Sequence, residues 1–127
     1  MKSAARLQNS AAWIVAIVLC FDFLGSAFRE LTGQAAMVAE FESLGLSRWF
    51  MHLTGVVELV AAILVVIPRY SRPGAVLMAG VTVAAIYAHV SSGRAQTVGA
   101  LVALLFLALV ELWLRAAFRA PVVIAEG

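Results

Sequence analysis

The segment from Trp49 to Ile67, WFMHLTGVVELVAAILVVI, constrains the fold more than any other part of this chain. It is 19 residues long and almost wholly apolar, and an α-helix of that length crosses the hydrocarbon core of a bilayer. Glu58 lies at its centre. A charged side chain at that depth costs about 2.5–3.5 kcal/mol on insertion scales, so Glu58 needs a partner, a proton or a function. We interpret the segment as a membrane-spanning helix.

Three further apolar runs have the same character, and the four spans are predicted at about 11–28, 49–67, 75–90 and 97–114. Hydrophobic residues make up 64% of the chain and charged residues 13%. Soluble domains average about 45–50% and about 25%, so this composition excludes an ordinary water-soluble core. A length of 127 residues favours a single domain over 1–127.

Residues 29–48 are too polar to span a membrane. Met37, Phe41 and Leu44 fall on one helical face, whereas Glu40 and Glu42 are polar. This pattern predicts a short helix at the surface or tucked against the spans. The predicted fold class is therefore all-α, an integral membrane antiparallel four-helix bundle with a short extra extracytoplasmic helix between the first and second spans.

The lysines and arginines predict the orientation of the spans. Three lie on the side of the 29–48 segment, and six lie on the side of the two termini: Lys2, Arg6, Arg69, Arg72, Arg115 and Arg119. Because positive residues collect on the cytoplasmic side, both termini are predicted to be cytoplasmic. The net charge of +2 and the lack of a basic block argue against nucleic acid as a partner.

Five ionisable side chains lie inside the predicted spans. Glu111 precedes Arg115 by four residues near a membrane interface, which predicts a structural ion pair. The predicted topology places the other four at the centre or in the outer half of the membrane, and Tyr87 adds a hydroxyl at that depth: Asp22, His52, Glu58 and His89. These residues predict a polar pocket in the outer half of the bundle.

The chemistry of these residue types sets what such a pocket can do. A carboxyl group in a low dielectric can hold a proton, and histidine relays protons near neutral pH. Glu58, His89, Asp22, His52 and Tyr87 are therefore candidates for ligand binding or proton carrying. The alternative is that they only make hydrogen bonds between helices. No HExxH, P-loop or GxSxG motif occurs in the sequence, so we expect neither a metal site nor catalytic activity of the chain's own.

Three segments carry a family resemblance: FLGSAFRELTG, FESLGLSRWFMHLTGVVELVAAILVVIPRYSRPGA with its G-x-x-E-L pattern, and AIYAHV. Over about residues 12–115 the chain resembles the DoxX / DoxX-like family of small bacterial membrane proteins. The resemblance implies a four-helix bundle in the bacterial inner membrane. It also implies that Glu58 and His89 match the polar motif of the family.

Some members of that family are subunits of a thiosulfate:quinone oxidoreductase, and others belong to membrane oxidoreductase complexes in oxidative-stress defence. The leading hypothesis is an accessory or partner-binding subunit of a membrane complex of this kind, with lipids and a protein partner or a second copy around it. It requires no cofactor, and quinone is the one that could bind. Cys20 is the single cysteine, which argues against direct thiol exchange.

Two alternatives stay open. In a quinone-reactive oxidoreductase subunit, Glu58 would carry the proton and His89 would orient the quinone headgroup. In a small proton-coupled transporter, Asp22 would be the essential acid.

Overall fold

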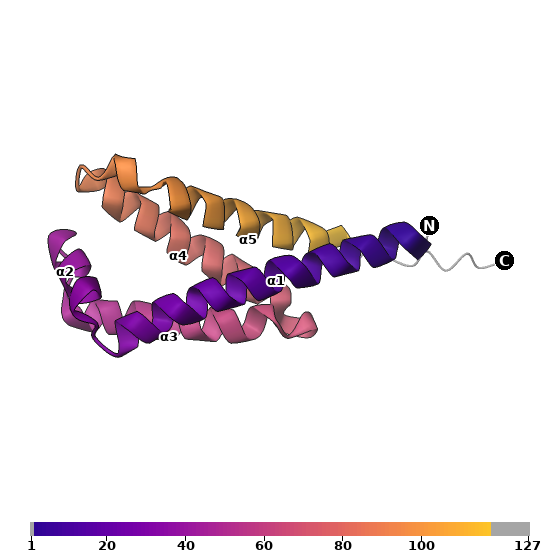
Figure 1. Cartoon of the computed structure of the whole chain (residues 1–127), viewed down its shortest axis with the longest axis horizontal. Coiled ribbons are helices and arrows are strands. Elements are labelled where there is room, and N and C mark those ends of the chain that lie inside the picture. The colour runs from indigo at the N-terminus through magenta and orange to yellow at the C-terminus, as the bar shows by residue number, and fades with distance from the viewer. Residues whose placement is uncertain (1, 118–127) are drawn as a thin grey trace.

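The computed structural model describes residues 2–117, and this part of the chain contains helices and no strand (Figure 1). Four of the helices are long and apolar enough to cross a membrane, which confirms the predicted all-α class and the expected number of helices able to span it. They are α1 (Lys2–Leu31), α3 (Arg48–Val65), α4 (Ser71–Ser91) and α5 (Gly99–Ala117). The short elements are α2 (Ala35–Ser43), η1 (Pro68–Tyr70) and η2 (Ala95–Thr97).

The first helix is longer than the span predicted for it. It begins at Lys2 rather than near residue 11, because the residues before the apolar run are mostly good helix formers with no glycine or proline among them. It also continues past Phe28 to Leu31. Gly33 then takes a φ of 66°, a left-handed conformation that glycine adopts at little cost and that ends helices.

Helix α4 begins inside the segment PRYSRPG, residues 68–74, which lie between the second and third predicted spans. Ser71 is its first residue and Pro73 lies in its first turn, where the missing N–H of proline has no helical partner to lose. Gly74 follows and is buried. A Cβ atom built on Gly74 would lie 2.6 Å from the backbone nitrogen of Val65, so the lack of a side chain lets α4 start directly against the end of α3.

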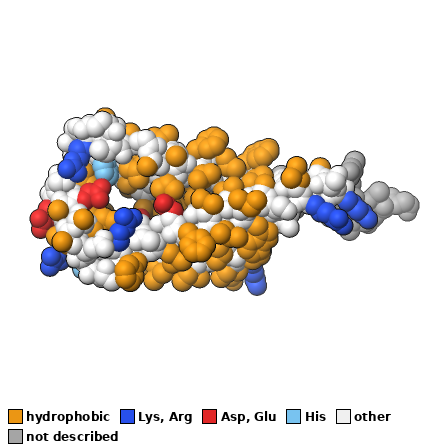
Figure 2. All heavy atoms as spheres, in the orientation of Figure 1, with side chains coloured by type: hydrophobic (Ala, Val, Ile, Leu, Met, Phe, Trp, Pro, Cys, Tyr) orange, Lys and Arg blue, Asp and Glu red, His pale blue; other side chains and the backbone are white. Residues whose placement is uncertain are grey.

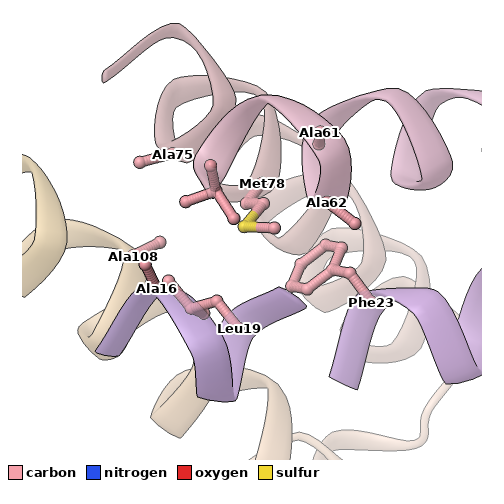
Figure 3. Close-up of a cluster of buried hydrophobic side chains, with 9 residues drawn as sticks. Ala16, Leu19, Phe23, Ala61, Ala62, Ala75, Met78 and Ala108 are labelled. Atoms are coloured by element: carbon pink, nitrogen blue, oxygen red, sulfur yellow. The ribbon is translucent and has the colours of Figure 1, made fainter. Parts of the chain in front are cut away.

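The core is built mainly from small side chains. Helix α1 packs against α3 and α5, and α4 packs against the same two helices. Figure 3 shows the buried cluster between them, more than half of which is alanine: Ala16, Leu19, Phe23, Ala61, Ala62, Val65, Ala75, Met78 and Ala108. Small residues let helix backbones approach closely, which is how helices associate in lipid.

Large apolar side chains cover the outside of the four long helices (Figure 2). Phe21, Phe106 and Trp113 are more than half exposed, and aliphatic residues fill the surface between them. Soluble monomers rarely expose continuous apolar surface on this scale. The surface therefore agrees with the hydropathy of the helices in indicating a membrane protein.

The helix pairs lie close together at one end of the molecule and diverge toward the end that carries α2 (Figure 1). At the close-packed end, the Gln8 side-chain amide donates a hydrogen bond of 3.2 Å to the carbonyl of Leu114, which joins α1 to α5. At the other end, the pair α1 and α3 lies further from the pair α4 and α5. The cavity described below lies at this end.

Candidate functional site

A cavity of about 1050 Å³ lies at the end of the molecule that carries α2. Helices α1 to α5 all contribute to its lining, and it is partly open to the surface. Figure 2 shows charged side chains gathered around an opening at this end. Its size is at the upper end of the roughly 300–1000 Å³ typical of ligand pockets. Much of the wall is apolar: Phe41, Phe50, Leu53, Val57, Leu101 and Leu104.

Glu58 lines this cavity from the middle of α3. The buried face of α3 repeats every three or four residues, as one face of a helix does, and includes Met51, Gly55, Glu58 and Ala62. Only 7% of Glu58 is exposed. The acid that the sequence places at mid-membrane depth therefore points into the protein and not toward lipid.

Glu30 of α1 lies beside Glu58 and is a site residue that the sequence patterns did not indicate. It is 3% exposed. Its carboxyl group lies next to the Glu58 carboxyl, and the Ser26 side chain lies beside Glu58 as well. Because an ionised carboxylate only accepts hydrogen bonds, the two acids bond to each other only when one of them carries a proton. We refer to Glu30 and Glu58 as the carboxyl pair.

Gly55 allows the carboxyl pair to form. It precedes Glu58 by three residues on the buried face of α3. A Cβ atom built there would lie 3.0 Å from Cγ of Leu31 and 3.2 Å from Cβ of Glu30. These contacts are tighter than packed side chains usually make, so a larger residue would push the end of α1 away and separate the two acids.

The carboxyl pair is incompletely satisfied. Oε2 of Glu30 and Oε2 of Glu58 are both buried, and neither has a hydrogen-bond partner within the described chain. Arg29 lies nearby on the cavity wall, but its Nε donates to the carbonyl of Gly25 at 3.3 Å, and it makes no ion pair with any residue between 2 and 117. Buried polar atoms without partners are costly, and they occur where a ligand, a water or a proton completes the site.

His89 lines the cavity from α4 and links it to α2. Its Nδ1 lies 2.8 Å from the carbonyl of Ala85, and its Nε2 lies 3.2 Å from Oε1 of Glu40. Since a carbonyl oxygen only accepts, Nδ1 carries a hydrogen and donates it. Nε2 and Glu40 then form a hydrogen bond only when a further proton lies between them. Glu40 is a second partner that the sequence patterns did not indicate.

The remaining candidates lie in different surroundings. Asp22 lines the cavity but is exposed, so it lies at the rim. Tyr87 is also at the edge and is 74% exposed. His52 is half-buried and is not among the described residues that line the cavity. The structure thus brings Glu58 and His89 to one cavity, with Asp22 and Tyr87 at its margin and His52 outside it.

Glu111 and Arg115 form an ion pair away from the cavity. Arg115 Nε donates to Glu111 Oε1 at 2.8 Å, at the four-residue spacing noted in the sequence. Ser71 of α4 donates to the same oxygen at 2.9 Å, and the Arg115 guanidinium lies 5.4 Å from the centre of the Trp13 ring. Glu111 is 0% exposed. The network therefore joins α1, α4 and α5 in the interior of the protein.

Comparison with known proteins yields one family. The model of the DoxX-like family matches residues 14–111. The matched range contains every residue that lines the cavity, and it ends at Glu111. No curated protein and no solved structure matches the chain.

Proposed function

The chain belongs to the DoxX-like family, and we propose that it is an accessory subunit of a membrane complex that binds an amphiphilic ligand in the cavity between its helix pairs. One observation carries the proposal. A cavity of about 1050 Å³ with largely apolar walls holds two polar groups, the carboxyl pair and the His89–Glu40 pair. Such a cavity suits a molecule with a polar head and an apolar body, and a molecule of this kind reaches it from the bilayer.

We further propose that the four long helices form an antiparallel bundle in a bacterial inner membrane. The course of the chain in Figure 1, which reverses between consecutive long helices, supports this arrangement. The excess of Lys and Arg on the side of the termini supports cytoplasmic ends, although Arg119 of that set lies outside the described residues. Helix α2 and the mouth of the cavity would then lie on the extracytoplasmic side.

Labelling of single cysteines tests this orientation. In a Cys20→Ala background, a membrane-impermeant maleimide applied to intact spheroplasts should label Ser43→Cys in α2 and leave Ser3→Cys in α1 unlabelled. Both positions are exposed, so access depends on the side of the membrane and not on burial. Labelling of Ser3→Cys alone would reverse the proposed orientation. Both sites should react once the membrane is permeabilised.

A quinone-reactive subunit is the second candidate function. The observation that favours it is the presence, on two walls of one cavity, of ionisable pairs that can supply a proton or a hydrogen bond: the carboxyl pair and the His89–Glu40 pair. The two carbonyl oxygens of a quinone ring accept such bonds. When a quinone is reduced it takes up protons and electrons. These side chains would supply protons, and a partner subunit would supply electrons.

Native mass spectrometry from mild detergent tests the proposed function by reporting bound ligand, partner and copy number together. We expect the wild-type chain to retain an amphiphilic molecule and to co-purify with a stoichiometric protein partner. Ala85→Trp, which adds bulk to the cavity wall, should lose the small molecule. Ala103→Trp should keep it, because Ala103 is exposed on α5 and does not line the cavity among the described residues.

The results separate the alternatives. A retained quinone would favour the redox candidate, and a retained lipid or other amphiphile would favour the accessory role. Equal retention by the two tryptophan variants would contradict ligand binding in this cavity. A lone monomer recovered from native membranes would contradict the role as a subunit. The reactivity of the Cys20 thiol, which is only half-buried, should be compared among the variants to show that each one is folded.

A further inference from the structure

We propose that the ligand of the cavity is a lipophilic cation, an amphiphile whose head is a protonated amine or an onium group. The inference rests on the proposed function, and it adds the chemical class of the ligand. Four acids line the cavity against one arginine and one histidine: Asp22, Glu30, Glu40 and Glu58 against Arg29 and His89.

The protons that hydrogen bonding within these pairs would need do not cancel all of the negative charge on the four acids. A hydrogen bond within the carboxyl pair needs one proton, and the 3.2 Å contact between His89 Nε2 and Glu40 Oε1 needs another. If each pair holds a single proton while Arg29 and Asp22 are ionised, the described cavity wall carries one net negative charge. Asp22 lies within electrostatic range of Glu58 and Glu40 lies within range of Glu30, while Arg29 is the one arginine of the described cavity lining near both members of the carboxyl pair. Negative charge in a low dielectric is costly unless a positive group lies close to it.

Buried atoms of the carboxyl pair indicate where the positive head would bind. Glu30 and Glu58 are 3% and 7% exposed, and each keeps Oε2 without a partner in the described chain. Arg29 forms no ion pair with either acid in the described chain, and its Nε donates to the carbonyl of Gly25 in its own helix. A cationic head that donates to or contacts these oxygens would supply both the charge and the partner that the site lacks.

The rest of the wall favours an organic cation with an apolar body. Phe41 and Phe50 line the cavity, and aromatic faces attract cations. Leu53, Leu101 and Leu104 offer an apolar surface. Within residues 2–117 no group of three or more His, Cys, Asp or Glu side chains is placed to hold a metal ion, and a cavity of about 1050 Å³ is far larger than a bare ion. A neutral quinone would leave the excess negative charge uncompensated.

The test compares a cation with a neutral molecule of similar shape. The full chain is placed in nanodiscs of zwitterionic lipid, and binding of tetraphenylphosphonium and of triphenylphosphine oxide is measured by equilibrium dialysis against empty nanodiscs. We expect saturable binding of the phosphonium, tighter than that of the neutral oxide by about tenfold or more, because only the cation is attracted by the negative charge of the acids in a low dielectric. Equal binding of the two probes would overturn the inference.

Variants show whether the acids are responsible. Glu30→Gln with Glu58→Gln keeps the shape of both side chains and removes their charge, so phosphonium binding should weaken by about tenfold or more. Glu42→Gln is the matched control, because Glu42 is exposed on α2 and outside the cavity lining of the described chain. If the double variant does not fold, Asp22→Asn at the exposed rim should still weaken phosphonium binding severalfold. Unchanged affinity in a folded variant would overturn the inference.

The two proposals fail in different ways. If Ala85→Trp displaces a neutral amphiphile while phosphonium does not bind to the wild-type chain, the cavity is a ligand site and the cationic class is wrong. If Ala85→Trp changes the binding of neither molecule, the ligand site itself is wrong.

Discussion

Arg115→Met should lower the free energy of unfolding by about 3–5 kcal/mol, the usual cost of removing one partner from a buried ion pair. Glu111 is 0% exposed, and the 2.8 Å bond from Arg115 is its one ion pair within the described chain. Ser71 would still donate one hydrogen bond to it. A single neutral donor cannot balance a buried carboxylate, so the variant leaves Glu111 with uncompensated charge. Methionine keeps much of the apolar length of the arginine side chain, so the decrease in the free energy of unfolding would come mainly from removing the positive charge.

The measurement is unfolding by sodium dodecyl sulfate in mixed micelles, followed by the reaction of a thiol dye with Cys20, which is only half-buried in the folded protein. Arg69→Met is the control. Arg69 is exposed, and its guanidinium lies over the Tyr70 ring at 5.5 Å, as Arg115 lies over an aromatic ring, but the described chain offers it no carboxylate. The control should change stability by about 0.5 kcal/mol or less. An equally small effect at both positions would show that the Glu111–Arg115 pair does not hold the helices together.

Gly74→Ala should destabilise the protein by about 1–3 kcal/mol, the range for overpacked interiors. The added methyl group would lie 2.6 Å from the backbone nitrogen of Val65 and 3.0 Å from the backbone carbon of Leu64. No change of side-chain rotamer relieves a contact with backbone, so the start of α4 must move away from the end of α3. The same unfolding measurement would detect the change.

Gly80→Ala provides the comparison within the same helix. A Cβ atom at Gly80 meets nothing within 4 Å. Alanine is the better helix former, so this variant should be neutral or more stable by up to about 1 kcal/mol. If Gly80→Ala lowered the stability as much as Gly74→Ala, the effect would come from replacing glycine in the helix. It would then not show that Gly74 is needed for the close approach of α3 and α4.

The number of long helices could be predicted because each one is a long apolar run, whereas their ends could not. Hydropathy records which residues suit the hydrocarbon core, and a helix continues beyond that core until its hydrogen bonding is interrupted. Residues 2–10 are helical for this reason, and Glu30 belongs to α1 although it follows the apolar run. Asp22, Ser26 and Glu30 are spaced by four residues, so a longer first helix would have placed Glu30 on the same face as Asp22.

The site was predictable only in part. Glu58 and His89 stand out because polar residues inside apolar runs are costly and therefore conspicuous. Their partners Glu30 and Glu40 lie in the polar segment between the first two spans. An acid in a polar segment does not by itself indicate a buried site. Glu40 is 49 residues away from His89 in the chain, and no local pattern relates two positions so far apart.

Properties that repeat along the chain could be predicted from the order of the residues alone: the lengths of the apolar runs, the buried face of α3 and the four-residue spacing of Glu111 and Arg115. They follow from the geometry of a single helix in a bilayer. Which helix faces meet follows from packing between helices, and here it depends on sites of close approach such as Gly55 and Gly74. For that reason the carboxyl pair, the His89–Glu40 contact and the cavity between them emerged only from the folded arrangement of the helices.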